Sequence, residues 1–242
     1  MTNASKLAMS LTDKIIVISQ PWGGLGDNLQ YSTLPELYST MGYKVYISST
    51  NSYRNPEIYD LVWKLNPYVS GVLDSPPNSG ACRGYRSLPS GFTTSVELAH
   101  GLTNGYRIYP MIYYQPKLIP ELSNCILYDS KTISSCPQDD TIKNSFESIF
   151  QKYPELDVKK IEFCNISNRD TPYFNHSKYE IKSIFDMCDA IYSCKVFVCF
   201  FSGSSVLASA IKQDRSYPEV YSFGAPHGDT IFYQFKNITY VK

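Results

Sequence analysis

Two glycine-rich turns constrain the fold of this chain, because each joins a short apolar run to a pattern of helical spacing. The first turn lies at residues 21–27, between the run 14–20 and the helical pattern 28–41. The second lies at residues 202–205, after the run 195–200 and before another helical pattern. A β-branched run without polar alternation is typical of a strand covered on both faces in a parallel sheet. The chain is therefore expected to be an α/β protein.

Strands and helices are expected to alternate along the rest of the chain. Further strands are predicted at residues 44–49, 69–73, 109–114, 125–128, 160–164, 219–223 and 238–241, and further helices at 56–65, 94–101, 139–153, 179–193 and 206–212. Pro110, Pro116 and Pro120 suggest a linker near the middle. We therefore expect two Rossmann-like, doubly wound halves, residues 1–116 and 117–242, with an inter-domain cleft that binds ligands at the carboxyl ends of the strands.

Composition excludes several classes of function. The 242 residues include 22 basic and 22 acidic side chains, which gives no electrostatic reason to expect nucleic acid or an anionic membrane surface as a partner. The seven cysteines contain no C-x-x-C pair, so neither a zinc site nor a disulfide framework is indicated and a reducing compartment is expected. No signal peptide or transmembrane segment is apparent, so the protein is predicted to be soluble and cytoplasmic.

The first turn holds one carboxylate, Asp27, directly after three glycines, Gly23, Gly24 and Gly26. Glycine lets the backbone turn sharply and leaves room for a ligand against the main chain. Asp27 is then either the N-cap of the following helix or a functional acid. The dinucleotide-binding fingerprint fits poorly, because Leu29 stands where the third glycine belongs, and no P-loop pattern is present.

The second turn offers Ser202, Gly203, Ser204 and Ser205 at the start of a helix. Hydroxyl groups and backbone N–H groups at a helix N-terminus form a place where a diphosphate can dock. The alternative is an ordinary serine cap.

Loops near the expected strand ends supply further candidates. Gly224 and His227 follow the strand at residues 219–223, and a histidine at a strand end is a candidate ligand, although most loop histidines are surface residues. Arg83 and Arg86 lie in a long first-half loop, where guanidinium groups hold an acidic acceptor or phosphates unless they are simply solvated.

Taken together, these motifs resemble the ADP-heptose heptosyltransferase family of the glycosyltransferase-B (GT-B) superfamily. The matching elements in the first half are the G-D-x-L turn at residues 26–29 and the Thr-Leu-Pro element at 33–35. Those in the second half are the Phe-Ser-Gly-Ser turn at residues 201–204, the alanine-rich helix around 207–210 and the Phe-Gly-Ala-Pro segment at 223–226. The family's acid and histidine near the second turn are replaced here by Phe201 and by Val206 or Leu207.

The resemblance implies a glycosyltransferase that moves a sugar from a nucleotide-sugar donor to a glycan, glycolipid or glycoprotein acceptor. Asp27 is then the catalytic base, since a carboxylate must take the proton of the acceptor hydroxyl. Gly24, Gly26, Asn28, Arg83 and Arg86 fall in the loops of the acceptor-side half. The donor would be held by the second half, at Ser202, Gly203, Ser204, Ser205, Gly224 and His227.

The resemblance implies that transfer is inverting. Transfer is expected to be metal-independent, because no D-x-D triplet occurs, and no cofactor is expected beyond the nucleotide-sugar itself. Two alternatives remain open at this point. One is a non-catalytic carbohydrate- or nucleotide-binding protein on the same fold, and the other is a sugar-nucleotide epimerase or hydrolase.

Overall fold

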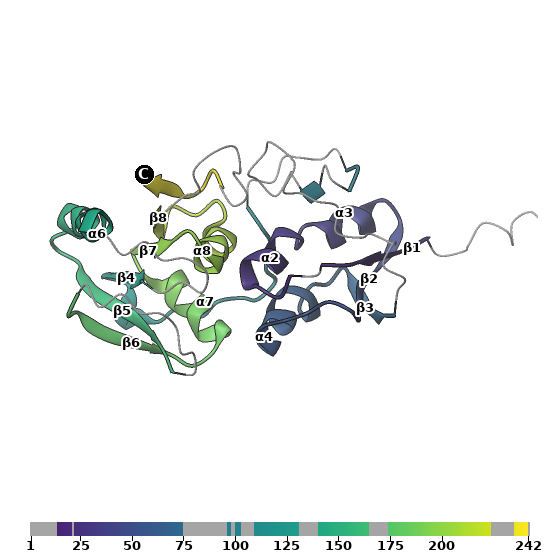
Figure 1. Ribbon diagram of the computed structural model, residues 1–242, viewed down its shortest axis with the longest axis horizontal. Coiled ribbons are helices and arrows are strands. Elements are labelled where there is room, and N and C mark those ends of the chain that lie inside the picture. Colours follow the sequence, from purple (N-terminus) through teal and green to yellow (C-terminus); the bar gives the residue numbers. More distant parts are fainter. Residues whose placement is uncertain are drawn as a thin grey trace, which may run out of the picture.

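The computed structural model describes residues 14–20, 22–74, 96–97, 100–102, 109–130, 140–164, 174–223 and 235–241. These residues form two separate sheets, one of three strands and one of six, and every strand pairs in parallel with its neighbours. Figure 1 shows the first sheet with its helices on one side of the molecule and the second sheet with its helices on the other. The expected α/β class with parallel sheets is confirmed.

The first sheet has the strand order β1-β2-β3. Its elements in chain order are β1 (Lys14–Ile18), α2 (Leu25–Gln30), α3 (Leu34–Thr40), β2 (Tyr43–Ser48), α4 (Pro56–Tyr59), the π-helical turn η1 (Asp60–Lys64) and β3 (Val69–Leu73). The first strand was predicted to be covered on both faces. This is wrong at the start of β1, where Ile15 is 52% exposed. With three described strands, a doubly wound first half stays a prediction.

The second sheet has the strand order β6-β5-β4-β7-β8-β9. Its elements are the short helix η3 (Pro120–Leu122), β4 (Cys125–Asp129), α6 (Asp140–Lys152), β5 (Asp157–Phe163), β6 (Ser177–Ile181), α7 (Ile184–Ser193), β7 (Val196–Phe200), α8 (Gly203–Lys212), β8 (Glu219–Phe223) and β9 (Thr239–Val241). Counted within this half, the order is 3-2-1-4-5-6, the order of dinucleotide-binding sheets. The direction of winding reverses between β4 and β7, which makes their carboxyl ends the expected ligand edge.

Buried apolar side chains form two clusters that explain the layers. One cluster contains Leu127 and Phe197 of the second sheet together with side chains of α7 and α8, and it continues into Leu29 and Trp63 of the first half. The other packs Phe146 of α6 against the opposite face of the second sheet. Helices therefore cover both faces of the second sheet, and a single apolar core joins the two halves.

Three sequence-based expectations are wrong in detail. The helix predicted at residues 28–41 is two helices, α2 and α3. Pro35, in the first turn of α3, has no backbone N–H and therefore cannot continue the hydrogen-bond pattern of α2 into α3. The helix predicted at 179–193 is preceded by strand β6, a mostly exposed strand at the sheet edge that lacks the apolar signature of a buried strand. The strand predicted at 109–114 is absent from the described secondary structure.

The segment 109–119 runs between the halves and satisfies its backbone with side chains instead of a sheet ladder. The N–H of Met111 donates to Ser32 Oγ of the first half at 2.7 Å. The N–H of Lys117 donates to Asp189 Oδ1 of α7 at 2.8 Å, and that oxygen also accepts from the Tyr114 hydroxyl at 3.0 Å. The domain boundary between residues 116 and 117 falls in this segment and stays a prediction.

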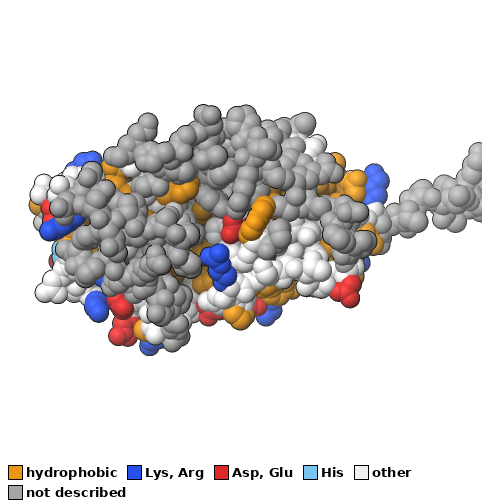
Figure 2. All heavy atoms as spheres, viewed as in Figure 1, with side chains coloured by type: hydrophobic (Ala, Val, Ile, Leu, Met, Phe, Trp, Pro, Cys, Tyr) orange, Lys and Arg blue, Asp and Glu red, His pale blue; other side chains and the backbone are white. Residues whose placement is uncertain are grey.

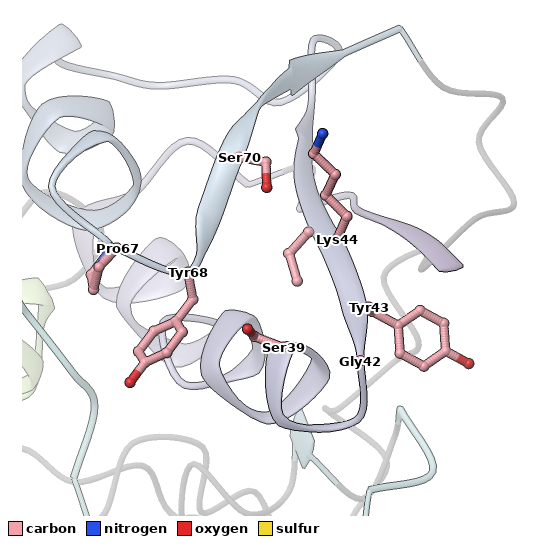
Figure 3. A pocket seen from close by; sticks show the side chains of 8 residues that line it. Ser39, Gly42, Tyr43, Lys44, Pro67, Tyr68 and Ser70 are labelled. Carbon is pink, nitrogen blue, oxygen red and sulfur yellow. The ribbon is translucent and has the colours of Figure 1, made fainter. Parts of the chain in front are cut away.

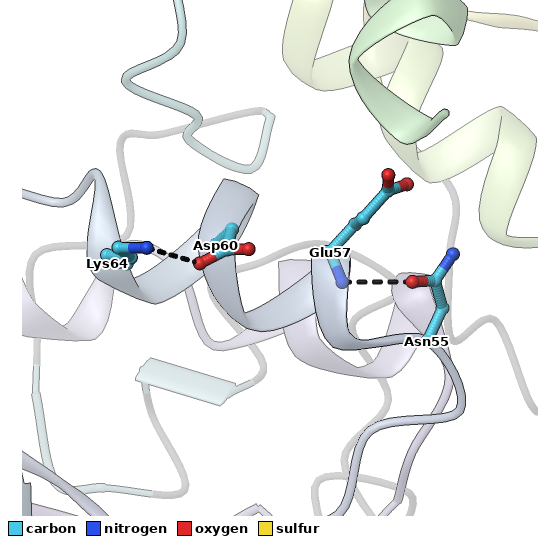
Figure 4. A network of polar contacts seen from close by, with 4 residues as sticks. All are labelled: Asn55, Glu57, Asp60 and Lys64. Atoms are coloured by element: carbon cyan, nitrogen blue, oxygen red, sulfur yellow. Dashed lines mark hydrogen bonds and ion pairs between the residues drawn. The ribbon is translucent and has the colours of Figure 1, made fainter. Parts of the chain in front are cut away.

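A second polar connection between the halves comes from α4. The Asn55 side chain caps this helix by accepting from the N–H of Glu57 at 2.9 Å. The Glu57 carboxylate points away from α4 toward the second half (Figure 4) and accepts from the N–H of Ile184, the first residue of α7, at 2.7 Å. A carboxylate is favoured there because the N-terminus of a helix carries partial positive charge.

In the part of the chain that the structure describes, no helix is long and apolar enough to cross a membrane.

Replacing Glu57 by Ala is expected to lower the free energy of unfolding by about 1–2 kcal/mol, since the Ile184 N–H loses its charged acceptor. Glu57→Gln keeps an acceptor oxygen and should cost less. Urea unfolding followed by circular dichroism measures both. Lys64→Ala is the matched control, because it removes the exposed ion pair with Asp60 on the same helical segment and should leave stability unchanged. Equal stability of Glu57→Ala and wild type would contradict the bridging role.

Candidate active site

The first glycine turn places the Asp27 carboxylate over the start of α2. Gly24 is the N-cap of this helix and Asp27 is its third residue, so the interpretation of Asp27 as the N-cap is wrong. A Cβ atom on Gly24 would stand 2.5 Å from Asp27 Oδ2, so a larger residue at this position would displace the carboxylate from its present place. Asp27 is half-buried. Its negative charge lies in the first turn, where the helix stabilises it.

Asn28 holds this turn together from within. It is fully buried, and its Nδ2 donates to the carbonyl oxygens of Gly24 at 2.9 Å and Trp22 at 3.3 Å. Its Oδ1 accepts from Trp63 Nε1 at 2.9 Å. Both the Nδ2 and the Oδ1 atom of Asn28 thus have partners within the protein. Asn28 therefore positions the turn that carries Asp27.

Sequence reasoning missed Arg54, which lies beside the same turn. Its backbone N–H donates to the carbonyl of Gly23 at 2.9 Å, and its Nη1 lies 4.0 Å from the point where a Gly24 Cβ would stand. The guanidinium group is therefore near the Asp27 carboxylate. The signal was available, because Arg54 follows β2, and the carboxyl ends of neighbouring parallel strands meet at one edge of a sheet.

The second glycine turn is a capping box at the start of α8. Ser202 Oγ accepts from the N–H of Ser204 at 3.2 Å and donates to the carbonyl of Phe200 at 3.2 Å. Ser205 Oγ accepts from the N–H of Ser202 at 3.2 Å and donates to the Ser202 carbonyl at 2.8 Å. Both hydroxyls thus have partners within the turn, as the alternative of a serine cap requires.

The third hydroxyl of this turn meets a carboxylate that sequence reasoning also missed. Ser204 Oγ donates to Asp129 Oδ2 at 2.5 Å. Asp129 is the last residue of β4 and is only 2% exposed. It therefore lies at the edge where the winding of the second sheet reverses. The sequence signal was a polar residue directly after the apolar run at residues 125–128.

The two glycine turns meet. A Cβ atom on Gly26 would stand 3.2 Å from the Cα of Gly203, and one on Gly203 would stand 3.2 Å from the backbone nitrogen of Gly26. Such distances are shorter than ordinary packing contacts. A larger residue at either position would therefore push the backbones of the two turns apart. The site thus brings the turn that holds Asp27 directly against the start of α8, and Figure 1 shows α2 and α8 side by side.

The remaining predicted residues are not placed. Arg83, Arg86, Gly224 and His227 lie outside the described residues. Figure 2 shows an acidic, a basic and an apolar side chain close together near the middle of the visible face, between areas that are not described. Across the described ranges no group of three His, Cys, Asp or Glu side chains is arranged to hold a metal ion.

A shallow pocket elsewhere does not compete with this site. It is lined by residues such as Gly42, Lys44, Pro67 and Ser70, which surround the amino ends of β2 and β3 (Figure 3). Asp27 lies at the opposite, carboxyl end of the same sheet, which is where open α/β sheets bind ligands.

Asn28→Ala is expected to destabilise the protein by about 1–3 kcal/mol, because it leaves the buried Trp63 indole N–H without its acceptor, whereas the Gly24 and Trp22 carbonyls keep the Asn28 N–H and Gln20 Nε2 as donors. Differential scanning calorimetry measures the loss. Asn55→Ala, which removes a helix cap from a half-exposed residue, should cost about 1 kcal/mol and serves as the comparison. A smaller loss for Asn28→Ala than for Asn55→Ala would contradict the role of Asn28 in holding the turn.

Comparisons with known proteins find likeness in structure only. No protein-family model matches the chain, and no curated protein matches it by sequence. The glycosyltransferase TibC of enterotoxigenic E. coli matches with a TM-score of 0.66 at 15% identity, over 96% of this chain and 63% of TibC. The present chain thus spans less than two thirds of the length of TibC.

Two shorter proteins match over most of their own length. A glycosyl transferase family 9 protein from Veillonella parvula has a TM-score of 0.58 at 8% identity, over 96% of this chain and 86% of its own. The E. coli heptosyltransferase WaaC has a TM-score of 0.54 at 8% identity, over 93% of this chain and 92% of its own. The resemblance to GT-B heptosyltransferases that the sequence predicts is therefore confirmed at the level of the fold.

Proposed function

We propose that this protein is a glycosyltransferase of the GT-B type, which moves a sugar from a nucleotide-sugar donor to a glycan or glycoconjugate acceptor. The observation that carries the proposal is the meeting of Gly26 and Gly203, since it sets the Asp27 carboxylate beside the start of α8 in a fold shared with heptosyltransferases. In this proposal, residues 1–116 form the acceptor side and residues 117–242 the donor side of a cleft.

Asp27 acts as the general base. An acceptor hydroxyl is a weak nucleophile until a carboxylate within hydrogen-bond reach takes its proton. A half-buried carboxylate at the carboxyl end of β1 is suited to this task, and it lies beside the exposed guanidinium of Arg54, which suits an anionic acceptor or a phosphate. One displacement without a covalent intermediate inverts the configuration at the sugar.

The donor belongs at the carboxyl ends of β4 and β7, where the strand order of the second sheet favours a nucleotide. TibC has been solved with ADP-D-beta-D-heptose and WaaC with ADP, so adenine nucleotides are the first donors to test. A thermal-shift screen of nucleoside diphosphates and nucleotide-sugars identifies the donor, because a ligand of the folded state raises the melting temperature. Transfer is proposed to need no metal ion.

One observation weakens the expected stabilisation of the leaving diphosphate and so favours the alternative of a binding protein without turnover. The hydroxyls of Ser202, Ser204 and Ser205 all have protein partners, so a diphosphate at α8 must displace them or rely on backbone N–H groups. A selective thermal shift without transfer to any acceptor, and without hydrolysis or epimerisation of the donor, identifies this alternative.

Asp27→Asn is expected to lower kcat by ~10²- to 10⁴-fold while donor affinity stays nearly unchanged, because Asn keeps the size but cannot accept the proton. Initial rates with the identified donor and calorimetric donor binding measure the two effects. Loss of the helix-dipole contact should cost only about 0.3–1 kcal/mol of stability. Full activity with a lower melting temperature would show that Asp27 is a structural residue and that the base lies elsewhere.

Turnover is expected to survive treatment with EDTA, since the proposed stabilisation of the leaving diphosphate comes from backbone N–H groups at the start of α8 and from its hydroxyl groups once these exchange their protein partners for the diphosphate. Activity of the dialysed protein with and without the chelator measures this. If EDTA abolishes transfer and added manganese restores it, the metal-independent mechanism is wrong.

A further inference from the structure

We propose that Asp129 is a specificity-determining residue, whose fixed negative charge weakens binding of the nucleoside diphosphate product relative to the nucleotide-sugar donor. This inference rests on the proposed glycosyltransferase function and assigns a role to a side chain that the transfer chemistry does not use. Asp129 lies at the donor edge, pairs in register with Cys199 of β7, and binds the hydroxyl of the second residue of α8.

The contact with Ser204 is that of an ionised carboxylate. An O–H···O distance of 2.5 Å lies in the range of charge-assisted hydrogen bonds, which are shorter than neutral ones. The start of α8 thus already holds a negative charge of the protein's own.

That position is where a nucleotide phosphate would otherwise be most favoured, because the helix N-terminus and the switch point of the sheet coincide there. A buried like charge opposes a phosphate more strongly than an exposed one, since the protein interior screens charge less than water does. Asp129 therefore makes the site sensitive to how much charge a nucleotide carries.

Transfer changes that charge. The bond from the sugar carbon to the terminal phosphate oxygen breaks, the bond to the acceptor oxygen forms, and the acceptor proton passes to Asp27. The freed oxygen leaves the product with a terminal phosphate whose second ionisation has a pKa of about 6, so at pH 7.5 it carries about one more negative charge than the donor. Repulsion by Asp129 is therefore stronger for the product, which favours its release.

Isothermal titration calorimetry of wild type and Asp129→Asn at pH 7.5 tests the proposal with ADP, ADP-heptose and adenosine, or with the corresponding three ligands if the thermal-shift screen selects another base. Asn keeps the size and an oxygen that accepts from Ser204. We expect ADP to bind about tenfold tighter to Asp129→Asn, the nucleotide-sugar to gain less, and the nucleoside to be unchanged.

Two further variants separate charge from structure. Ser204→Ala removes the hydrogen bond but keeps the charge, so it should not tighten ADP binding. Asp214→Asn removes the same charge just beyond the far end of α8, roughly 15 Å away at 1.5 Å per residue, and should leave all three affinities unchanged.

The outcomes distinguish a failure of the role of Asp129 from a failure of the proposed function. Nucleotide binding by wild type with no tighter ADP binding by Asp129→Asn overturns the role of Asp129 and leaves the proposed function standing. An equal gain for ADP and the nucleoside, or the same gain in Ser204→Ala, also overturns it, because the effect then does not follow phosphate charge. Failure of every protein to bind any nucleotide overturns the proposed function and this inference with it.

Discussion

The close approach of Gly26 and Gly203 is the constraint on which the rest of this structure depends. Neither backbone has a side chain at the contact, so the first turn of α2 lies directly against the first turn of α8. Two helix N-termini that face each other would repel through their partial positive charges. Each has a carboxylate beside it, Asp27 at α2 and Asp129 at α8, so the electrostatic cost of the contact is offset locally. The residues of chemical interest are therefore also those that make the contact tolerable.

Much of the fold could be predicted from the sequence because its strongest signals are local. The buried strand β7 and the first four residues of β4 are continuous apolar runs, and β3 and β8 match their predicted bounds. The secondary-structure predictions were wrong where long-range contacts determine the conformation. The edge strand β6 is polar, and the segment 109–119 carries β-forming residues but bonds to side chains of both halves, which no periodicity reveals.

The same contrast between local and long-range signals holds for the candidate site. Glycine turns and Asp27 are visible in the sequence because the turn chemistry is encoded within a few residues. Arg54 and Asp129 were missed because each reaches the site from the end of a different strand, and only the pairing of strands brings such residues together. Asn28 was placed toward the acceptor, whereas its partner Trp63 is 35 positions away in the chain. A residue's role in this protein follows from long-range partners more than from its own motif.

The segment 109–119 has a consequence for the mechanics of the molecule. Its N–H groups bond to Ser32 on one side and to Asp189 and Ser193 on the other, and the Glu57 carboxylate spans the same division. The segment is thus bonded to the first half at Met111 and to the second half at Lys117 and Ile119, while the Glu57 bond and the shared apolar core oppose rotation of one half against the other. The connection therefore holds the two halves in one relative orientation and leaves little freedom for a swing of one half against the other.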